Sequence, residues 1–306
     1  MATQLPYMTQ RHQKHDVHWM VVSPAHSGVL CVACLVEQVE NDETPLVQRK
    51  VVLSLLSSLL EENGEVAAKF EENLLLCRHM IDIATGSFFK HDQHVDTAVK
   101  VCQLILETAE SEDLVWYTTD KLHFQLQDTQ DLVSVLPYLV LLGRLLAISP
   151  AYGFHILHKH ESLLLLVLRL LNQTSDEDCL CSVIYVFIHL LDDSLQSDMS
   201  LDVRCGVYQV LVSLLDNAQT LDLRLNLLAL LKNILKNIDE ESVKLLMAPS
   251  PDNRYLVMGL KKMLITKHEM LQTASAHCVK ALMSHSRDES TVTQILESDL
   301  AGESVD

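Results

Sequence analysis

The sequence predicts an all-α protein built from stacked helical repeats, and three observations lead to this prediction. The central part of the chain holds four leucine-rich runs of helical length, separated by short polar breaks. The second pair of runs repeats the first at an offset of about 44 residues. Only 8 glycines and 7 prolines occur in 306 residues, which disfavours a turn-rich β fold. The four runs cover residues 163–171, 180–191, 207–215 and 221–235.

Earlier in the chain, helices are expected between recognisable start and stop signals. Thr44 and Pro45 are typical of an N-cap followed by a first helical position. Asn63 and Gly64 are typical of a helix end. Apolar runs bounded by polar residues predict the remaining helices, and the first opens at Pro24. The expected helices are residues 24–40, 44–62, 66–84 and 95–109.

Residues 114–130 are the least clear part, because their pattern fits strand or helix. We interpret them as a short helix plus an irregular connection, with a possible weak break at residues 111–131. Residues 132–148 are predicted helical, with Pro137 either kinking the helix or marking its true start. The remaining expected helices are residues 149–158, 239–247, 254–265, 269–285 and 290–300.

The chain is therefore expected to have three parts. Residues 1–22 are polar, histidine-rich and predicted to be poorly ordered, residues 23–300 form the solenoid, and residues 301–306 are an acidic tail. The first helix is apolar on much of its surface, whereas a solenoid needs polar caps. Either residues 1–22 cover it or repeats precede it, in which case the chain is a fragment or isoform of a longer protein.

One polar residue recurs at the same place in successive units, within a pattern of apolar, any, polar, apolar, apolar. Stacking at a constant period would line these residues up along one face. We predict that they contact a protein partner and refer to them as the ladder positions. They are Ser58, Gln103, Arg144, His189 and Asn233, at spacings of 45, 41, 45 and 44 residues.

Residues 162–191 and 206–235 resemble armadillo units, and Leu231-Lys232-Asn233-Ile234 is similar to that family's Leu-x-Asn-Leu. The similarity to the armadillo and HEAT families spans roughly residues 28–285. It implies a right-handed superhelical solenoid of about five to six repeats, with a concave groove where Asn holds a ligand backbone. Only Asn233 keeps that Asn. Ala229 stands where nuclear-import adaptors carry Trp, which argues against recognition of lysine-rich import signals.

Residues 27–37, which run from Ser27 through Cys31 and Cys34 to Glu37, also resemble the meiosis inhibitor protein family. That resemblance implies a germ-cell factor required for meiotic recombination and chromosome synapsis. It is the alternative to the more general hypothesis of a scaffold.

Charge and cysteine usage limit the possible partners and the compartment. The formal net charge is −18, from 23 basic and 41 acidic residues, which disfavours direct contact with nucleic acid. A basic or extended protein segment fits better, although the acidic clusters at turns also suit helix capping. Eight cysteines, mostly in apolar runs, favour a reduced intracellular protein, cytoplasmic or nuclear. No leader or membrane span is indicated.

Two patterns suggest metal chemistry, but each has a simpler interpretation. Cys31 and Cys34 have the spacing of half a zinc site or a redox pair. No second pair follows, and their apolar surroundings favour core cysteines. His12, His15 and His18 could line one helix face, but they lack matching partners and favour a polar tail. We therefore predict no metal ligands and no cofactor.

The functional hypothesis is a non-catalytic scaffold that binds a partner segment in the concave groove. The sequence lacks G-x-S-x-G, G-x-x-x-x-G-K-[ST], G-x-G-x-x-G and H-E-x-x-H, so no catalytic residues are predicted. A protein partner is expected, rather than nucleic acid, membrane or a small-molecule substrate.

Overall fold

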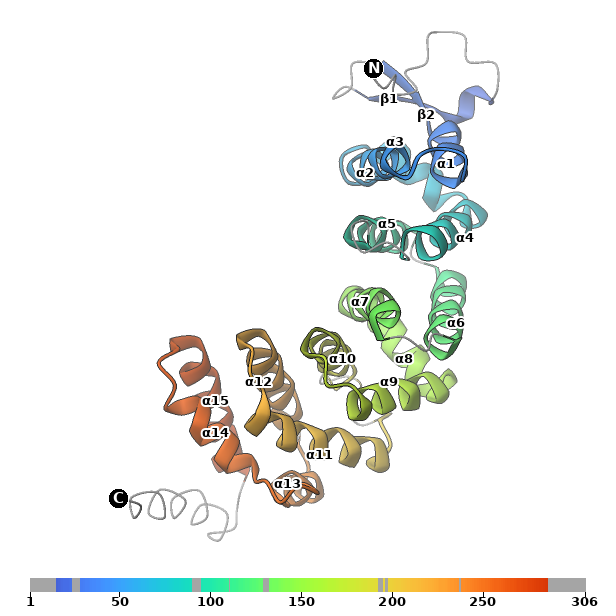
Figure 1. Cartoon of the computed structure of the whole chain (residues 1–306). Helices are drawn as coiled ribbons and strands as arrows, with labels where there is room; N and C mark the ends of the chain where they lie inside the picture. Colours follow the sequence, from blue (N-terminus) through green and yellow to red (C-terminus); the bar gives the residue numbers. More distant parts are fainter. Residues whose placement is uncertain are drawn as a thin grey trace, which may run out of the picture. The chain divides into compact units, whose positions relative to one another are not determined.

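The chain folds into helices that pack on one another, with a single two-stranded sheet among the described residues (Figure 1). This computed structural model describes residues 15–23, 28–89, 95–109, 111–128, 132–191, 195, 198–236 and 238–285. The chain divides into two compact units, Met1–Ala151 and Tyr152–Asp306. The all-α class is confirmed, and the helix–helix packing within each unit is consistent with a helical solenoid.

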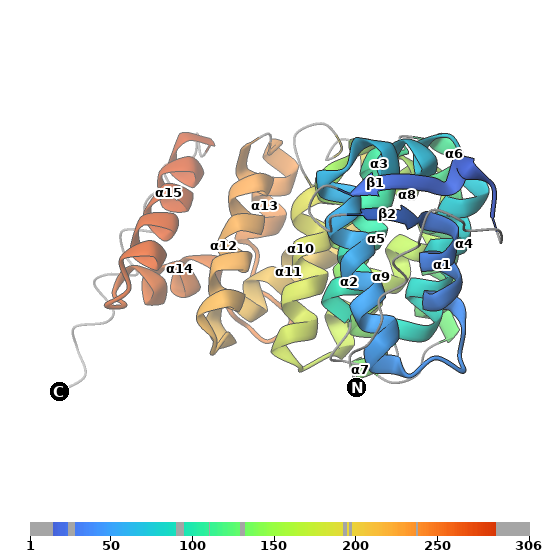
Figure 2. The ribbon, with the colours of Figure 1, turned by 90° about the horizontal axis from the view of Figure 1, so that it is seen from above.

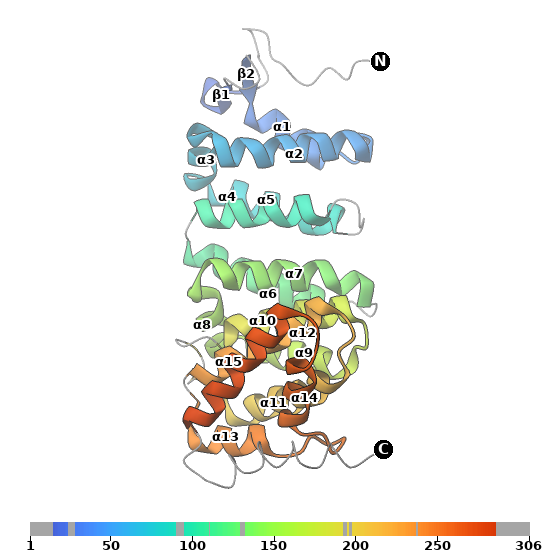
Figure 3. The ribbon, with the colours of Figure 1, turned by 90° about the vertical axis from the view of Figure 1, so that its left-hand side faces the viewer.

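The first unit is built in two layers of helices. In one layer α2, α5 and α7 pack on each other in turn (Figure 3), and in the other α1, α4 and α6 do so (Figure 1). Each helix thereby buries an apolar stripe against its neighbours. The elements are η1 (Val17–Trp19), β1 (Met20–Ser23), β2 (Gly28–Cys31), α1 (Val32–Glu40), α2 (Leu46–Glu62), α3 (Gly64–Glu71), α4 (Leu74–Ile83), the π-helical turn η3 (Ala84–Phe88), α5 (Val95–Thr108), α6 (Glu112–Asp128) and α7 (Leu132–Ile148).

The first unit begins with an antiparallel strand pair where the sequence predicted a poorly ordered segment and a helix from Pro24. β1 pairs with β2, and Met20 lies opposite Cys31. Val21 and Leu30 are 1% exposed, whereas Val22 is 60% exposed. Exposure that alternates from residue to residue is typical of a strand. In the sequence, a short run of valines and leucines fits a strand and a buried helix equally well. The predicted helix start at Pro24 is therefore wrong, because the helix begins at Val32.

The single helix predicted at residues 66–84 is two helices, each with its own asparagine cap. The Asn63 side chain accepts a hydrogen bond from the Glu65 amide and opens α3. The Asn73 side chain accepts one from the Leu76 amide and opens α4. Both asparagines satisfy amide groups that a helix start leaves without a backbone partner.

The irregular connection predicted within residues 114–130 is also wrong, because α6 is continuous over Glu112–Asp128. Its buried stripe includes Thr118 and Thr119 between leucines. The Thr119 hydroxyl donates to the Val115 carbonyl at 2.7 Å, so its polar atom is satisfied within the helix. Because threonines occupy buried positions of α6, the apolar residues alone do not show a helical period in the sequence.

Polar contacts join the helices of the first unit around α4, α6 and α7. The Tyr117 hydroxyl donates to the Asp82 carboxylate of α4 at 2.5 Å, and Lys121 forms an ion pair with the same carboxylate. Burial, together with Asp82, raises the pKa of Tyr117 above its ordinary value. The Tyr138 hydroxyl of α7 donates to the Thr85 carbonyl of η3 at 3.2 Å. Pro137 lies inside α7.

The second unit is also built in two layers of helices. In one layer α10, α12 and α15 pack in turn (Figure 2). In the other, α9 packs on α11, and α11 packs on α13 and α14. The four central runs predicted from the sequence are confirmed as helices. The elements are α8 (Pro150–Lys159), which begins just before the division, α9 (Glu161–Gln173), α10 (Glu177–Leu190), α11 (Leu201–Asn217), α12 (Leu221–Lys236), α13 (Glu240–Met247), α14 (Leu256–Leu264) and α15 (Glu269–His285).

Three sequence predictions fall partly or wholly outside the described residues. The helix at residues 290–300 and the acidic tail at 301–306 lie outside them, as do residues 1–14 of the N-terminal segment. Among the described helices, no single one is long and apolar enough to cross a membrane. Only Ser134–Ile148 and Pro150–Lys159, taken together as a bent pair, reach the length and hydropathy of a span.

Candidate functional site

The ladder positions of the first unit lie on the helices of one layer. Ser58 is on α2, Gln103 on α5 and Arg144 on α7, and these helices pack on each other in turn. Ser58 donates to the Ser54 carbonyl, and Gln103 donates to the Glu107 carboxylate at 2.9 Å. Arg144 is exposed. All three therefore stand on one layer of the unit with part of their surface open to solvent.

The ladder positions of the second unit lie on the adjacent helices α10 and α12. The Asn233 side chain donates to the Ile188 carbonyl at 2.8 Å, which brings it next to His189 in α10. The His189 ring lies edge-on to Tyr185, with centroids 4.7 Å apart. Asn233 thus uses its amide group to join two helices. Contact of any of the five ladder positions with a partner stays a prediction.

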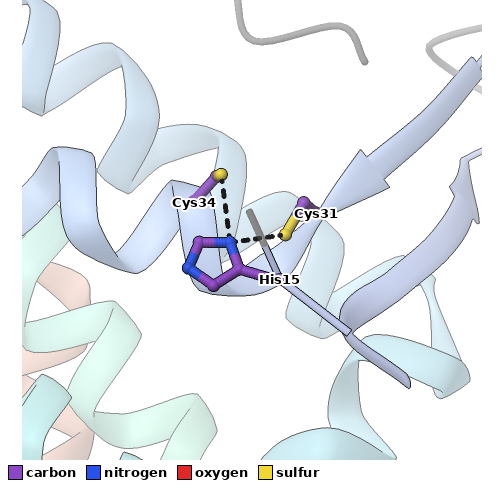
Figure 4. A group of neighbouring side chains, drawn as sticks. All are labelled: His15, Cys31 and Cys34. Atoms are coloured by element: carbon purple, nitrogen blue, oxygen red, sulfur yellow. Dashed lines mark hydrogen bonds between the residues drawn. The ribbon is translucent and has the colours of Figure 1, made fainter. Parts of the chain in front are cut away.

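A second group of side chains comes together at the start of the first unit. The His15 Nδ1 atom is 3.5 Å from the Cys31 sulfur and 3.4 Å from the Cys34 sulfur (Figure 4). Among the described residues, these three form the one group of His, Cys, Asp or Glu whose ligand atoms converge, all within 4.8 Å of one another. On the far side of the ring, Nε2 is 3.1 Å from the Glu37 carboxylate.

Local structure places each member of this group. Cys31 is the last residue of β2 and the N-cap residue of α1, and Cys34 lies in the first turn of that helix. Glu37 follows three residues later, which places it near Cys34 on the helix surface. His15 immediately precedes Asp16, whose side chain caps η1 by accepting from the His18 amide at 3.1 Å. The pairing of β1 with β2 brings His15, which precedes β1, close to Cys31 at the end of β2.

The other buried cysteines lie in different surroundings. None of the eight cysteines, all of which are described, is in a disulfide. Burial raises the pKa of Cys77 to about 11, and raises that of Cys102 and Cys278 to about 12. Cys77 donates to the Phe70 carbonyl at 3.1 Å. These thiols are protonated core groups, as the sequence predicted for the cysteines in general.

No pattern in the sequence joins His15 to the cysteine pair. Spacing groups His15 with His12 and His18, but the structure places His18 near Lys69, with Nδ1 and Nζ 3.3 Å apart. The usable signal was Cys-x-x-Cys at a strand-to-helix boundary followed by Glu37. It was hidden because residues 28–31 were predicted as helix.

Comparisons with known proteins identify relatives of this chain. Residues 30–302 match the family model described as the meiosis inhibitor protein 1 N-terminal domain. Human meiosis inhibitor protein 1 is 30% identical over 291 residues, which is 90% of this chain and 22% of the human protein. The mouse protein of the same name is 25% identical over 294 residues, 91% of this chain and 23% of the mouse protein. The chain thus spans less than a quarter of these relatives' length.

Proposed function

The chain belongs to the meiosis inhibitor protein 1 family, and we propose that it acts in meiosis as a non-catalytic, protein-binding segment of such a protein. The match over residues 30–302 carries this proposal, because it covers almost all of the chain. It favours the meiotic hypothesis over a scaffold of unspecified process. We propose participation in meiotic recombination and chromosome synapsis, and hence a nuclear role.

The proposed means of action is binding through the helical layers. Layers that pack in turn present one side chain per helix pair at regular intervals, which suits an extended partner. The net charge of −18 favours a basic protein segment over DNA. The armadillo or HEAT type, the number of five to six repeats and the concave groove are part of this proposal.

Disruption of the gene in the germ line of the source organism tests the process. We expect meiotic cells that fail in synapsis and in the repair of recombination intermediates, scored by staining chromosome axes and recombination foci. A transgene that encodes the unaltered full-length protein should restore both. Normal synapsis and normal recombination foci in the disrupted germ line would overturn the proposal.

A surface variant tests the mode of action separately. We expect the double variant Gln103→Ala/Arg144→Ala to lose rescue and partner capture, because both side chains project from adjacent helices of one layer. The matched control is Gln127→Ala/Lys159→Ala, whose side chains are exposed elsewhere. Surface changes of this kind alter stability by less than about 0.5 kcal/mol. Equal rescue by both double variants would contradict the ladder hypothesis while leaving the meiotic one standing.

A further inference from the structure

His15, Cys31 and Cys34 have the composition of a zinc site. Two thiolates and one imidazole are a ligand set that Zn²⁺ prefers. In a tetrahedral site with Zn–S of about 2.3 Å and Zn–N of about 2.0–2.1 Å, neighbouring ligand atoms stand about 3.5–3.8 Å apart. The two sulfur-to-Nδ1 distances are 3.5 and 3.4 Å. Both sulfur-to-nitrogen distances are therefore close to the separation that a bound ion requires, and the three ligand atoms all lie within 4.8 Å of one another.

The two sulfurs approach the same ring nitrogen. With Glu37 accepting the proton of Nε2, the His15 ring is left with one lone pair, at Nδ1. That lone pair can accept a hydrogen bond from one thiol, yet two sulfurs lie at nearly equal distances from it. An ion between them would bond to all three ligand atoms at once.

Glu37 adds an independent feature of a metal site. A histidine that binds a metal usually donates its other ring N–H to a carboxylate or carbonyl group, which fixes the ring and strengthens the ligand. Here the Glu37 carboxylate is 3.1 Å from Nε2, which is the ring nitrogen that does not approach the sulfurs. Cys31 and Cys34 are buried and His15 is half-buried, so the site is largely shielded from water.

We propose that His15 Nδ1, Cys31 Sγ and Cys34 Sγ bind one zinc ion, with Glu37 orienting the histidine. Water or a further side chain completes the tetrahedron. The ligands come from before β1, from the end of β2 and from the first turn of α1. The ion therefore closes the chain around the strand pair and fastens that pair to the first helix. Binding energy of this kind contributes directly to folding.

Metal analysis of the purified, reduced chain tests the proposal. After dialysis against zinc and then against metal-free buffer, we expect one equivalent of zinc per chain by mass spectrometry. Cobalt substituted for zinc should show thiolate charge-transfer and tetrahedral ligand-field bands. The variants Cys31→Ser/Cys34→Ser and His15→Ala should lose both signals. The control Cys181→Ser/Cys205→Ser alters two half-buried cysteines of the second unit and should keep them.

A conservative variant guards against loss of binding through misfolding. Glu37→Gln keeps all three ligands, and we expect it to weaken zinc affinity about 10–100-fold. In the wild-type chain, chelation should speed amide exchange in β1, β2 and α1 while leaving α10 and α12 unchanged. A reduced chain that retains no zinc, or one that retains it after the Cys31/Cys34 change, would overturn the proposal. Unchanged affinity in Glu37→Gln would remove Glu37 from it.

Discussion

Helices α9 to α12 of the second unit bury mostly leucine, valine, isoleucine and phenylalanine at helical spacing. The described part of residues 15–40 in the first unit buries valines and leucines too, but it does so in a strand pair and a short helix, and it brings His15 to Glu37 and Val22 to Asn63. The periodic region draws its stability from many equivalent apolar contacts, each of which can be inferred from local pattern. The N-terminal region adds to its apolar contacts a few specific polar ones that no local pattern reports. The difference teaches that periodicity reports packing, while convergent sites require the three-dimensional structure.

The largest expected effect is the loss of a core side chain in the periodic region. Phe187 of α10 is fully buried. Phe187→Ala should lower the free energy of unfolding by about 3–5 kcal/mol, through lost burial and the cavity left behind. Urea denaturation measures this. Leu165→Ala on α9, where the side chain is 50% exposed, is the control and should have a much smaller effect.

A pair of glycine substitutions compares backbone packing in the two units. A Cβ at Gly259 of α14 would lie 2.9 Å from the Leu215 Cβ and 3.3 Å from its carbonyl carbon. Gly259→Ala should therefore destabilise by about 1–3 kcal/mol, despite the better helix propensity of alanine. At Gly64 of α3 nothing lies within 4 Å of the added atom. A melting-temperature decrease for Gly64→Ala as large as that for Gly259→Ala would contradict the close approach of α14 to α11.

The attachment of the strand pair can be tested at Asn63. Its side chain opens α3 and also donates to the Val22 carbonyl of β1 at 3.0 Å. Asn63→Ala should cost about 0.5–2 kcal/mol, and it should speed amide exchange in β1. Asn73→Ala removes an equivalent cap at α4 and is the matched control. If both variants speed exchange in β1 equally, the contact with Val22 does not hold the strand.

The smallest expected effect is the loss of stability at acid pH through two carboxylates of the second unit, Glu177 and Asp239. Hydrogen bonds from Thr220 and the Gln219 amide hold the pKa of Glu177 below its usual range, and the Ser242 amide and Arg204 do so for Asp239. Because both folded-state pKa values are depressed, the stabilisation is present above the ordinary carboxyl pKa of about 4 and is lost as pH falls below it.

Urea midpoints at neutral pH and at about pH 3 test this sign. The variant Glu177→Gln/Asp239→Asn should be less stable than the wild type at neutral pH and should lose less stability on acidification. Glu240→Gln, at an exposed position, is the control. A steeper acid loss in the double variant would reverse the assignment.

The central helices of the second unit, α9 to α12, could be predicted from sequence because apolar residues, mostly leucine and valine, define each buried stripe. The confirmed helices there include α10 and α12, which carry His189 and Asn233. Prediction failed where polar residues, rather than an apolar period, determine the start or the buried face of a helix. Thr118 and Thr119 concealed α6, and Asn73 concealed the start of α4. The approach of His15 to Cys31 depends on strand pairing, and no spacing rule in the sequence reports it.

The π-helical turn η3 has a mechanical consequence. Thr85 lies in this turn, and its carbonyl accepts from Tyr138 of α7, while the Phe89 ring lies 5.1 Å from the Tyr138 ring. The corner that leads from α4 to α5 is thereby tied to a helix that follows more than forty residues later. A force that peels α7 away would load this corner directly, so local opening there should spread backward along the chain to the end of α4.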